Sequence, residues 1–449
     1  MNPIGAPAVA AIGAAPSEDY WDWLIIAAIF LGIAVLAYAS FRMALFDHWF
    51  SLARKGDWTG LLLRPTVLWI LMGTSLLAFR TWLWLRYRPF PSATGLDAPS
   101  LTVVIPAYNE GPMVERSIES VARAEYPHDR LQILVIDDGS KDDTWSYIER
   151  AAQRHPGLVT AVRFAENQGK RAALAEGFRR ARGEVLITVD SDSVIERQAL
   201  LAMAGPFRNP TVGAVAGKVA VYNRYKGLLP RMLHVRFTLA FDFLRSAQST
   251  YGTVYCCPGA LAAYRASVVH KVLAQWEHQR FLGAPCTFGE DRALTNFILG
   301  CGFDTVYQKT AVVHTIVPEN YGKLCKMFLR WNRSYVREEI RFARIVWKRP
   351  LGARVTAFLD TTITNLRYPV GYVSLALLVV YSVHDPLTIA RMLIGIGVVS
   401  TFYMLYYLKS ERSWDFAFGI LYAYFSFFAL MWIFPYAVLT VRARSWLTR

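Results

Sequence analysis

Val185-Leu186-Ile187-Thr188-Val189-Asp190-Ser191-Asp192 joins an apolar run to two carboxylates. A strand of this kind delivers its last side chains to the carboxyl edge of a sheet, where residues two apart can point the same way. Asp190 and Asp192 can therefore share one hard divalent cation, for which a diphosphate-bearing substrate is a natural partner. A D-x-D triplet alone is more often a solvated turn, so its surroundings decide the interpretation.

The chain is too long for one ordinary domain and too hydrophobic to be wholly soluble. It has 449 residues, 54% of them hydrophobic, and a mean hydropathy of +0.25. These values are typical of a membrane protein. The apolar residues concentrate at the two ends, whereas residues 96–318 have the mixed composition of a soluble α/β domain. We therefore expect a globular domain inserted between two groups of membrane spans.

Apolar stretches near the length of about 20 residues that crosses a bilayer core flank this domain. The predicted spans are Trp23–Ala39, Pro65–Trp84, Tyr368–Val383, Leu387–Leu408 and Phe416–Val441. The last carries Pro435 and fits either one kinked helix or two passes, so residues 356–449 would cross three or four times and residues 1–95 about twice. Residues 319–355 are basic and amphipathic, which predicts interfacial helices. The polar residues of 360–367 either line a sugar path or form an interfacial helix.

The net charge of +15 reflects basic residues beside apolar segments, as in residues 323–354. Anionic lipid headgroups explain this distribution better than nucleic acid does. A basic tail at residues 442–449 favours the cytoplasmic side. We expect a multi-pass protein of the plasma (bacterial inner) membrane with a cytoplasmic catalytic domain, although the basic segment 42–64 does not fit the same topology. Adjacent Cys256 and Cys257 among five cysteines argue against a disulfide framework.

Apolar runs alternate with amphipathic stretches through the first half of the central domain. The predicted strands are Leu101–Ile105, Gln132–Asp137, Val159–Phe164 and Val185–Asp190. This alternation is typical of a doubly wound, mostly parallel sheet, whose ligands bind at the carboxyl ends of the strands. Pro106-Ala107-Tyr108-Asn109-Glu110 and Asp137-Asp138-Gly139-Ser140 follow strands there, and Gly169-Lys170-Arg171 comes soon after the third. Each motif alone could be a turn or a solvated helix start, but their joint occurrence predicts one site.

These motifs, together with Gly289-Glu290-Asp291-Arg292 and Arg330-Trp331, resemble those of family 2 glycosyltransferases with the α/β GT-A fold. The resemblance covers residues 100–345. With the flanking spans, the chain is most similar to hyaluronan synthases and rhizobial chitin-oligosaccharide synthases. The resemblance implies a UDP-sugar donor. It favours UDP-GlcNAc, with or without UDP-GlcA as a second donor. It also implies a growing glycan as acceptor and Mg²⁺ or Mn²⁺ as cofactor.

By this resemblance, the nucleotide and its diphosphate are bound by Tyr108, Glu110, Asp137, Asp138, Lys170 and Arg330. Asp190 and Asp192 hold the metal. The acceptor residues are Trp331, as a floor under the terminal sugar, with Glu290, Cys257 and Gly259. From local sequence alone, Arg330 and Trp331 could equally be a snorkelling arginine and an interfacial tryptophan.

Asp291 is the candidate catalytic base. It falls in the first turn of a predicted helix, Ala293–Leu299, where the helix dipole favours an ionised carboxylate. An ionised acid can take the proton from an acceptor hydroxyl as its oxygen attacks the anomeric carbon. Without the family pattern, Asp291 could simply cap its helix. No second carboxylate is obviously placed for a covalent intermediate, which favours single displacement with inversion.

The chain departs from the resembling family at two places. The usual Gln-x-x-Arg-Trp motif has Met327 at the glutamine position, and a thioether cannot make the two-sided hydrogen bonds of an amide. We therefore expect acceptor or diphosphate handling to differ. The second departure is Gly259-Ala260 after Cys257-Pro258, where hyaluronan synthases usually have Gly-Pro.

Taken together, the sequence predicts a metal-dependent, inverting, processive glycosyltransferase that polymerises a β-linked polysaccharide and translocates it through its own spans. Met327 keeps open a non-processive enzyme that adds one or a few sugars to a lipid acceptor. A third alternative is an inactive subunit that only binds nucleotide or conducts a glycan. Intact Asp190, Asp192 and Asp291 argue against it.

Overall fold

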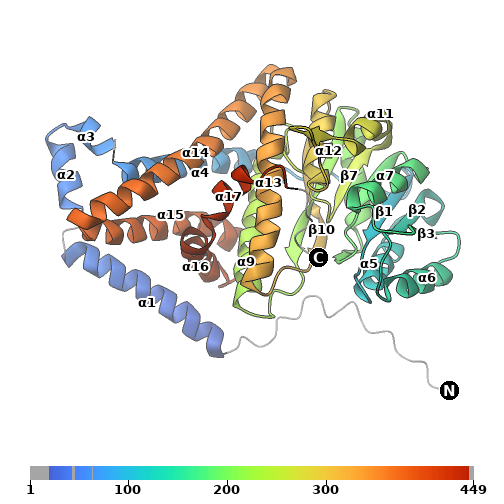
Figure 1. Ribbon diagram of the computed structural model, residues 1–449, viewed down its shortest axis with the longest axis horizontal. Coiled ribbons are helices and arrows are strands. Elements are labelled where there is room, and N and C mark those ends of the chain that lie inside the picture. Colours follow the sequence, from blue (N-terminus) through green and yellow to red (C-terminus); the bar gives the residue numbers. More distant parts are fainter. Residues whose placement is uncertain (1–19, 43–45, 63, 444–449) are drawn as a thin grey trace.

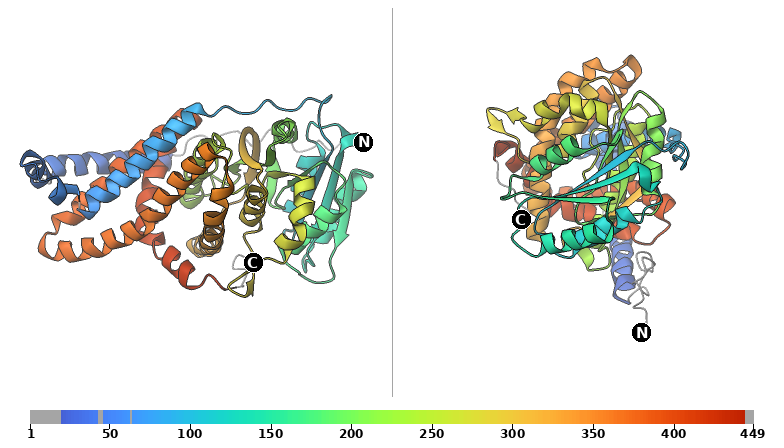
Figure 2. Two further views of the ribbon diagram at one scale, coloured as in Figure 1. Left: turned by 90° about the horizontal axis from the view of Figure 1, so that it is seen from above. Right: turned by 90° about the vertical axis from the view of Figure 1, so that its right-hand side faces the viewer.

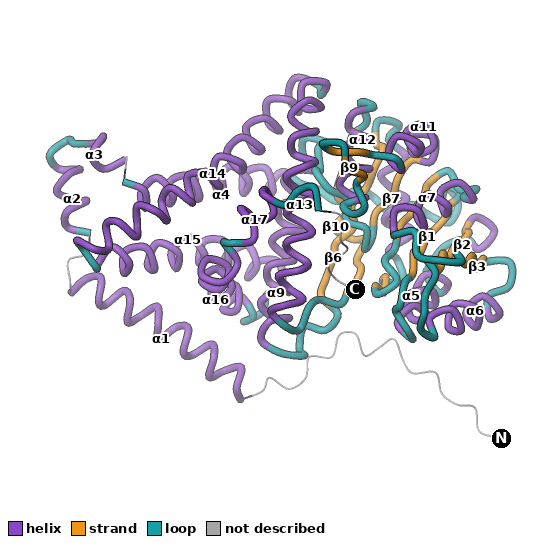
Figure 3. Tube along the Cα trace, in the orientation of Figure 1, coloured by secondary structure: helices purple, strands orange, loops and turns teal. Residues whose placement is uncertain are grey.

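The computed structural model of the chain describes residues 20–42, 46–62 and 64–443 (Figure 1). A domain that carries the strands lies at one end of the molecule, and long helices gather at the other, as Figure 3 shows by colour. The left view of Figure 2 shows the same separation from above, and in the right view the sheet domain faces the viewer. The structure therefore has the predicted architecture of a sheet domain flanked by helices from both ends of the chain.

The main sheet has eight strands in the order β3-β2-β1-β4-β7-β6-β10-β5. Their bounds are β1 Leu101–Ala107, β2 Leu131–Asp137, β3 Val159–Arg163, β4 Val185–Thr188, β5 Ser193–Ile195, β6 Val212–Val221, β7 Ala262–Arg265 and β10 Asp304–Thr315. The pairs β1–β2, β2–β3, β1–β4 and β6–β10 are parallel, whereas β7 and β5 run antiparallel to their neighbours. A short hairpin joins β8 Arg280–Phe281 to β9 Ala284–Pro285. The four predicted strands and the mostly parallel sheet are confirmed.

Helices cover both faces of this sheet because the strand side chains alternate. Val103 and Ile105 of β1 join one buried apolar cluster, and Val104 between them joins another. Ile118 of α5 packs in the first cluster and Phe178 of α7 in the second. The helices of this domain are α5 Met113–Ala122, α6 Thr144–Arg154, α7 Lys170–Arg180, α8 Ala199–Ala204, α9 Leu228–Thr238, α10 Leu244–Ser249, α11 Ala266–Glu277 and α12 Glu290–Gly300.

Helices from both ends of the chain form the rest of the molecule. Before the sheet domain come α1 Tyr20–Arg42, α2 Asp47–Arg54, α3 Trp58–Leu62 and α4 Pro65–Arg86. After it come α13 Tyr321–Ile345, α14 Leu351–His384, α15 Leu387–Glu411, α16 Phe416–Phe425 and α17 Ile433–Leu439. Within the described residues, three helices are long and apolar enough to cross a membrane: Val67–Arg86, Leu351–His384 and Leu387–Glu411.

Two further predicted spans have a different form. The first falls in α1, of which the apolar part Ala27–Arg42 is shorter than the three candidates. The last is bent by 44° between Phe416–Leu430 and Ile433–Leu439. Its bend lies just before Pro435, after a π-helical turn at Ser426–Leu430, so the predicted kink is present but begins upstream of the proline.

The predicted boundary at residue 356 falls inside α14, which runs without a break from Leu351 to His384. Pro350 caps its start, and Pro369 within it does not end it. The polar residues of 360–367 therefore belong to this long helix. Asp360 is 1% exposed and forms an ion pair of 2.7 Å with Arg80 of α4. This aspartate joins two helices instead of lining an open path.

Candidate active site

The carboxyl ends of β1, β2 and β4 place the predicted nucleotide residues at one edge of the sheet. Ala107 pairs with Asp137 in register, and β4 pairs with the other side of β1. Tyr108 and Asp138 follow β1 and β2 directly, and Asp190 comes two residues after the end of β4. The structure therefore brings together the strand-end motifs that the sequence singled out.

Asp138 holds the loop that precedes α7. Its two carboxylate oxygens accept backbone N–H groups from Gln168 at 2.7 Å and Gly169 at 2.9 Å. Burial raises the pKa of Asp138 to about 6, although these two N–H donors act in the opposite direction. Gly169 itself has φ +94°, a left-handed conformation that a side chain would strain. These two hydrogen bonds fix the start of α7 and therefore the position of Lys170.

Lys170 joins the two halves of the site. Its Nζ forms ion pairs with Asp190 Oδ1 at 2.5 Å and with Glu290 Oε1 at 3.3 Å. Burial disfavours the charged ammonium, but the carboxylates of Asp190 and Glu290 outweigh burial and raise the pKa of Lys170. The Asp291 carboxylate contributes in the same direction. A permanent positive charge therefore stands between the strand-end aspartates and the start of α12.

Asp190 and Asp192 lie on the open side of this lysine. The Asp190 side chain is 27% exposed, and Asp192 Oδ1 accepts the hydroxyls of Ser193 at 3.2 Å and Thr315 at 3.4 Å. Within the described residues, no group of three or more His, Cys, Asp or Glu side chains could hold a metal. Two carboxylates fit Mg²⁺ or Mn²⁺, which take hard oxygen ligands and accept phosphate oxygens and waters in their remaining positions.

Gly259 lies beside the same pair. A Cβ atom added there would stand 3.1 Å from Lys170 Nζ and 3.3 Å from Asp190 Oδ1. A side chain at this position would crowd the ammonium and the carboxylate. Gly259, which we expected beside the acceptor, therefore lies against Lys170 and Asp190.

The start of α12 is held close to α13. Gly289 has φ +74°, and an added Cβ would stand 1.9 Å from the Ser334 hydroxyl oxygen of α13. Arg292 of α12 forms an ion pair of 2.8 Å with Glu339 of α13. Glu338 is fully buried and accepts hydrogen bonds from Gln279 and Asn296. These contacts position Glu290 and Asp291 in the first turn of α12.

The two adjacent carboxylates of this turn have opposite pKa shifts. Burial raises the pKa of Asp291, and the neighbouring Glu290 charge adds to this rise. Glu290 is also buried, but the Lys170 ammonium lowers its pKa. The helix dipole was expected to favour an ionised Asp291; burial and the neighbouring Glu290 charge act in the opposite direction. A carboxylate with a raised pKa is a stronger base.

Cys256, a residue that the sequence did not single out for the site, contacts the candidate base Asp291. Its thiol donates a hydrogen bond to Asp291 Oδ2 at 3.5 Å. Cys257, the predicted acceptor residue, is instead fully buried in the apolar cluster behind the sheet. Burial raises the pKa of Cys257 to about 12. Neighbouring side chains in an extended segment point in opposite directions, and here the first cysteine of the pair faces the site.

An arginine that the motifs did not indicate lies beside Asp137, one of the predicted nucleotide residues. Arg163 at the end of β3 forms an ion pair of 3.1 Å with Asp137, and its guanidinium lies 5.3 Å from the Trp145 ring centre. Glu110 accepts a hydrogen bond of 2.9 Å from Ser191, the residue between Asp190 and Asp192. The position of Arg163 at a strand end was the signal that could have found it.

Helix α13 carries Arg330 and Trp331, the residues of the predicted acceptor platform. Trp331 is 37% exposed, and its ring centre lies 5.6 Å from Phe328 and 6.0 Å from Phe237. Arg330 lies close enough to Glu290 to help lower the pKa of that carboxyl group. Met327 is only 7% exposed and packs in the main apolar cluster. The side chain at the departure from the family motif therefore points into the core.

Comparisons with known proteins agree with this geometry. Residues 102–273 match the family described as glycosyl transferase family 2. An N-acetylglucosaminyltransferase of Azorhizobium caulinodans is 33% identical over 354 residues, which are 78% of this chain and 87% of that protein. A hyaluronan synthase of Streptococcus pyogenes is 32% identical over 355 residues, which are 78% of this chain and 83% of that protein.

A solved structure has the same fold. The chain superposes on a mannosyltransferase from Pyrobaculum calidifontis, in complex with GDP-Man and Mn²⁺, with a TM-score of 0.55 and 23% identity. The match covers 80% of this chain and 97% of that protein. The α/β GT-A architecture that the sequence predicted is confirmed. The chain belongs to glycosyltransferase family 2 and is a glycosyltransferase, flanked by helices that could span a membrane.

Proposed function

We propose that this chain is an inverting, metal-dependent, processive glycosyltransferase that extends a β-linked glycan from a cytoplasmic UDP-sugar. The observation that carries the proposal is the position of Lys170. It contacts Asp190 on the metal side and Glu290, beside the candidate base, on the other. A UDP-sugar with its diphosphate next to Lys170 would therefore have its leaving group on the Asp190 side and its anomeric carbon on the side of Glu290 and Asp291.

A divalent cation, Mg²⁺ or Mn²⁺, would be held by Asp190 and Asp192 and would supply charge neutralisation for the departing diphosphate. Lys170 adds a fixed positive charge beside them. Tyr108, Asp137 and Asp138 would hold the uridine at the sheet edge. Because Asp138 already uses both oxygens on the loop before α7, its main role would be to hold that loop in place.

Asp291 would act as the base in a single displacement. The acceptor hydroxyl oxygen bonds to the anomeric carbon, the bond from that carbon to the diphosphate breaks, and the hydroxyl proton passes to Asp291. The electron pair leaves with UDP, whose charge Lys170 and Arg330 would offset. Attack from the face opposite the diphosphate converts an α-linked donor to a β-linked product. The raised pKa of Asp291 supports its role as a proton acceptor.

Trp331 would form the floor for the terminal sugar of the acceptor, since an exposed aromatic face packs on the apolar face of a sugar ring. The rings of Phe237 and Phe328 support it from two helices. Glu290 is held by Lys170 near this position and would accept a hydrogen bond from an acceptor hydroxyl. The growing glycan would therefore meet the donor between α12 and α13.

The membrane assignment rests on the candidate spans Val67–Arg86, Leu351–His384 and Leu387–Glu411. We infer insertion in the plasma (bacterial inner) membrane with the catalytic domain on the cytoplasmic side, where UDP-sugars are available. The names of the two relatives favour UDP-GlcNAc, with or without UDP-GlcA. Translocation of the product through these helices is part of the same proposal.

The test is UDP release by the full chain reconstituted in lipid vesicles, with UDP-GlcNAc, UDP-GlcA, UDP-Glc and their pairs, in Mg²⁺ or Mn²⁺. We expect UDP-GlcNAc to support release, and product sizing to show a long polymer. Dependence on a pair of donors would indicate an alternating polymer. Products of one or a few sugars on a lipid would refute processivity. No release with any donor would favour an inactive, nucleotide-binding subunit.

A further inference from the structure

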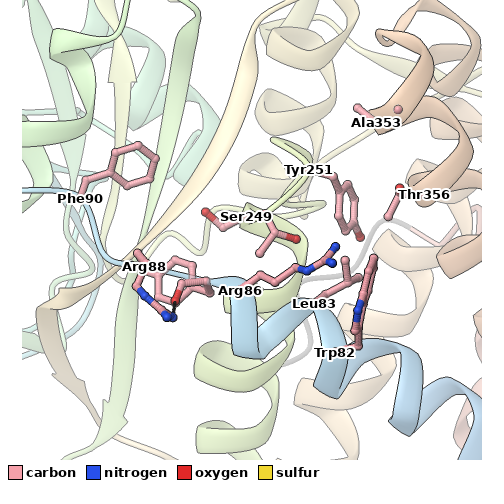
Figure 4. A pocket seen from close by; sticks show the side chains of 12 residues that line it. Trp82, Leu83, Arg86, Arg88, Phe90, Ser249, Tyr251, Ala353 and Thr356 are labelled. Atoms are coloured by element: carbon pink, nitrogen blue, oxygen red, sulfur yellow. Dashed lines mark hydrogen bonds between the residues drawn. The ribbon is translucent and has the colours of Figure 1, made fainter.

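A cavity of about 620 Å³ lies between the end of α4, the end of α10 and the start of α14. It is separate from the strand-end site, because no residue of the Asp190, Lys170 or Asp291 group lines it. Its wall combines Arg86 and Arg88 with the rings of Trp82 and Tyr251 and the hydroxyl of Ser249 (Figure 4). None of the described residues that line it carries a carboxylate. The cavity therefore favours a ligand with negative charge.

Arg86 is the cation in this cavity that is available to a ligand. Its guanidinium lies over the Trp82 ring at 3.6 Å and extends toward Tyr251 in Figure 4. Within the described chain it makes no hydrogen bond or ion pair. Arg88, by contrast, donates to the carbonyl oxygens of Leu85 and Tyr87. A guanidinium stacked on an aromatic ring keeps its edge N–H groups free for a phosphate.

The start of α14 adds backbone donors to the same wall. Gly352 and Ala353 line the cavity within the first turn of this helix of 34 residues. The cap residue Pro350 provides no side-chain hydrogen bond. The first N–H groups of a helix have no partner inside the helix and carry partial positive charge. These donors supplement Arg86.

The position of the cavity at the ends of two candidate spans favours a phospholipid headgroup over free phosphate as its anionic ligand. Arg86 is the last residue of the candidate span Val67–Arg86, and the cavity also contacts the first turns of the candidate span Leu351–His384. Leu85 and Leu351, next in sequence to lining residues, are exposed apolar side chains. A phospholipid has a charged headgroup joined to acyl chains, which matches a polar cavity beside exposed apolar helix surface.

We propose that this cavity binds the headgroup of an anionic phospholipid, with its phosphate between Arg86 and the start of α14. The proposal rests on the proposed membrane insertion but on no property of the sugar-transfer reaction. A phosphatidylglycerol headgroup suits the cavity better than phosphatidylcholine, because the choline ammonium has no lining carboxylate to pair with. The acyl chains lie along α4 and α14.

The experiment titrates the purified full chain in detergent with phosphatidylglycerol or phosphatidylcholine of equal acyl length and counts bound lipids by native mass spectrometry. We expect the first phosphatidylglycerol to bind more tightly than phosphatidylcholine. Arg86→Gln should weaken that binding about fivefold, as expected for one cation near a lipid surface. Arg42→Gln is the matched control, because Arg42 also ends an apolar helix, is exposed and lies outside the cavity.

A steric block tests the cavity itself. Gly352 lines the cavity, and an added Cβ there meets nothing within 4 Å, so the position has room for the start of the bulkier side chain in Gly352→Leu. We expect it to weaken phosphatidylglycerol binding at least as much as Arg86→Gln does. Gly371→Leu is its control, because Gly371 lies in the same helix, has equally open surroundings and is not part of the cavity wall.

Two results would overturn the proposal. One is equal binding of both lipids with no effect of Arg86→Gln and Gly352→Leu. The other is displacement of phosphatidylglycerol by inorganic phosphate at equal concentration, which would identify a site for free phosphate. Because no sugar donor is present, a chain that bound the lipid but released no UDP would contradict the proposed function alone.

Discussion

Asp190 and Asp291 lie on opposite sides of Lys170, and their surroundings differ. Asp190 follows a strand at the sheet edge, is partly exposed and pairs directly with the lysine. Asp291 lies in the first turn of α12 beside Glu290, where burial raises its pKa. One residue type therefore occupies two environments within one site. The open side suits metal and diphosphate, and the enclosed side suits a proton acceptor.

The largest expected effect comes from removing the enclosed carboxylate. Asp291→Asn should reduce UDP release by about 10²- to 10⁴-fold, because an amide cannot take the acceptor proton. UDP binding should persist, since Asp190 and Lys170 remain in place. The measurement is UDP release at saturating donor, with UDP affinity from calorimetry on the same protein. Transfer at the unaltered rate would show that Asp291 is no base and that the comparison of the two aspartates fails.

The open side should respond differently. Asp192→Asn leaves one carboxylate for the metal, so the Mg²⁺ or Mn²⁺ concentration for half-maximal activity should rise at least about tenfold. High metal concentration should restore part of the rate, which it cannot do for Asp291→Asn. Asp129→Asn is the control, because Asp129 is exposed and precedes the amino end of β2, whereas the site lies at the carboxyl ends of the strands. An unchanged metal requirement would remove Asp192 from the metal site.

The strands that carry the Asp190 side of the site could be predicted from the sequence. The apolar runs before Tyr108, Asp137 and Asp190 predicted β1, β2 and β4, because buried parallel strands are continuous apolar segments. Their order in a parallel sheet then placed the motifs at one edge. The antiparallel strand β7 and the long β6–β10 pair were not predicted, since their pairing depends on contacts far apart in the sequence.

Side-chain directions in the site were harder to predict than positions. Cys256 and Cys257 are adjacent, and sequence alone could not decide which one faces Asp291. The hydrogen bonds that Asp138 accepts from the loop before α7 were not predicted either. Their donors are backbone N–H groups, which exist at nearly every position. The pairing of Asp360 with Arg80 required two helices about 280 residues apart to meet.

A pH profile tests the electrostatic part of the comparison. Asp291 accepts a proton only when it is ionised, so activity should fall as the pH drops through its raised pKa. Glu290→Gln removes the adjacent negative charge, which lowers the pKa of Asp291 and moves the acid limb of the profile to lower pH. The measurement is the pH dependence of kcat/KM. Glu149→Gln, at an exposed position of α6, should leave the acid limb of the pH profile in place. If Glu149→Gln moved this limb as much as Glu290→Gln does, or if Glu290→Gln did not move it, the electrostatic coupling of Glu290 to Asp291 would be contradicted.

The smallest effect is expected at Met327, which is only 7% exposed. Its side chain packs in the apolar cluster, so Met327→Leu should change the thermal unfolding temperature little, equivalent to less than about 1.5 kcal/mol. Met327→Gln buries an amide among apolar side chains and should cost about 1–3 kcal/mol, lowering that temperature. Product length should be the same for wild type and Met327→Leu. If Met327→Gln instead kept its stability and lengthened the product, this position would face the glycan, and the acceptor side of the site would extend beyond Asp291 and Trp331.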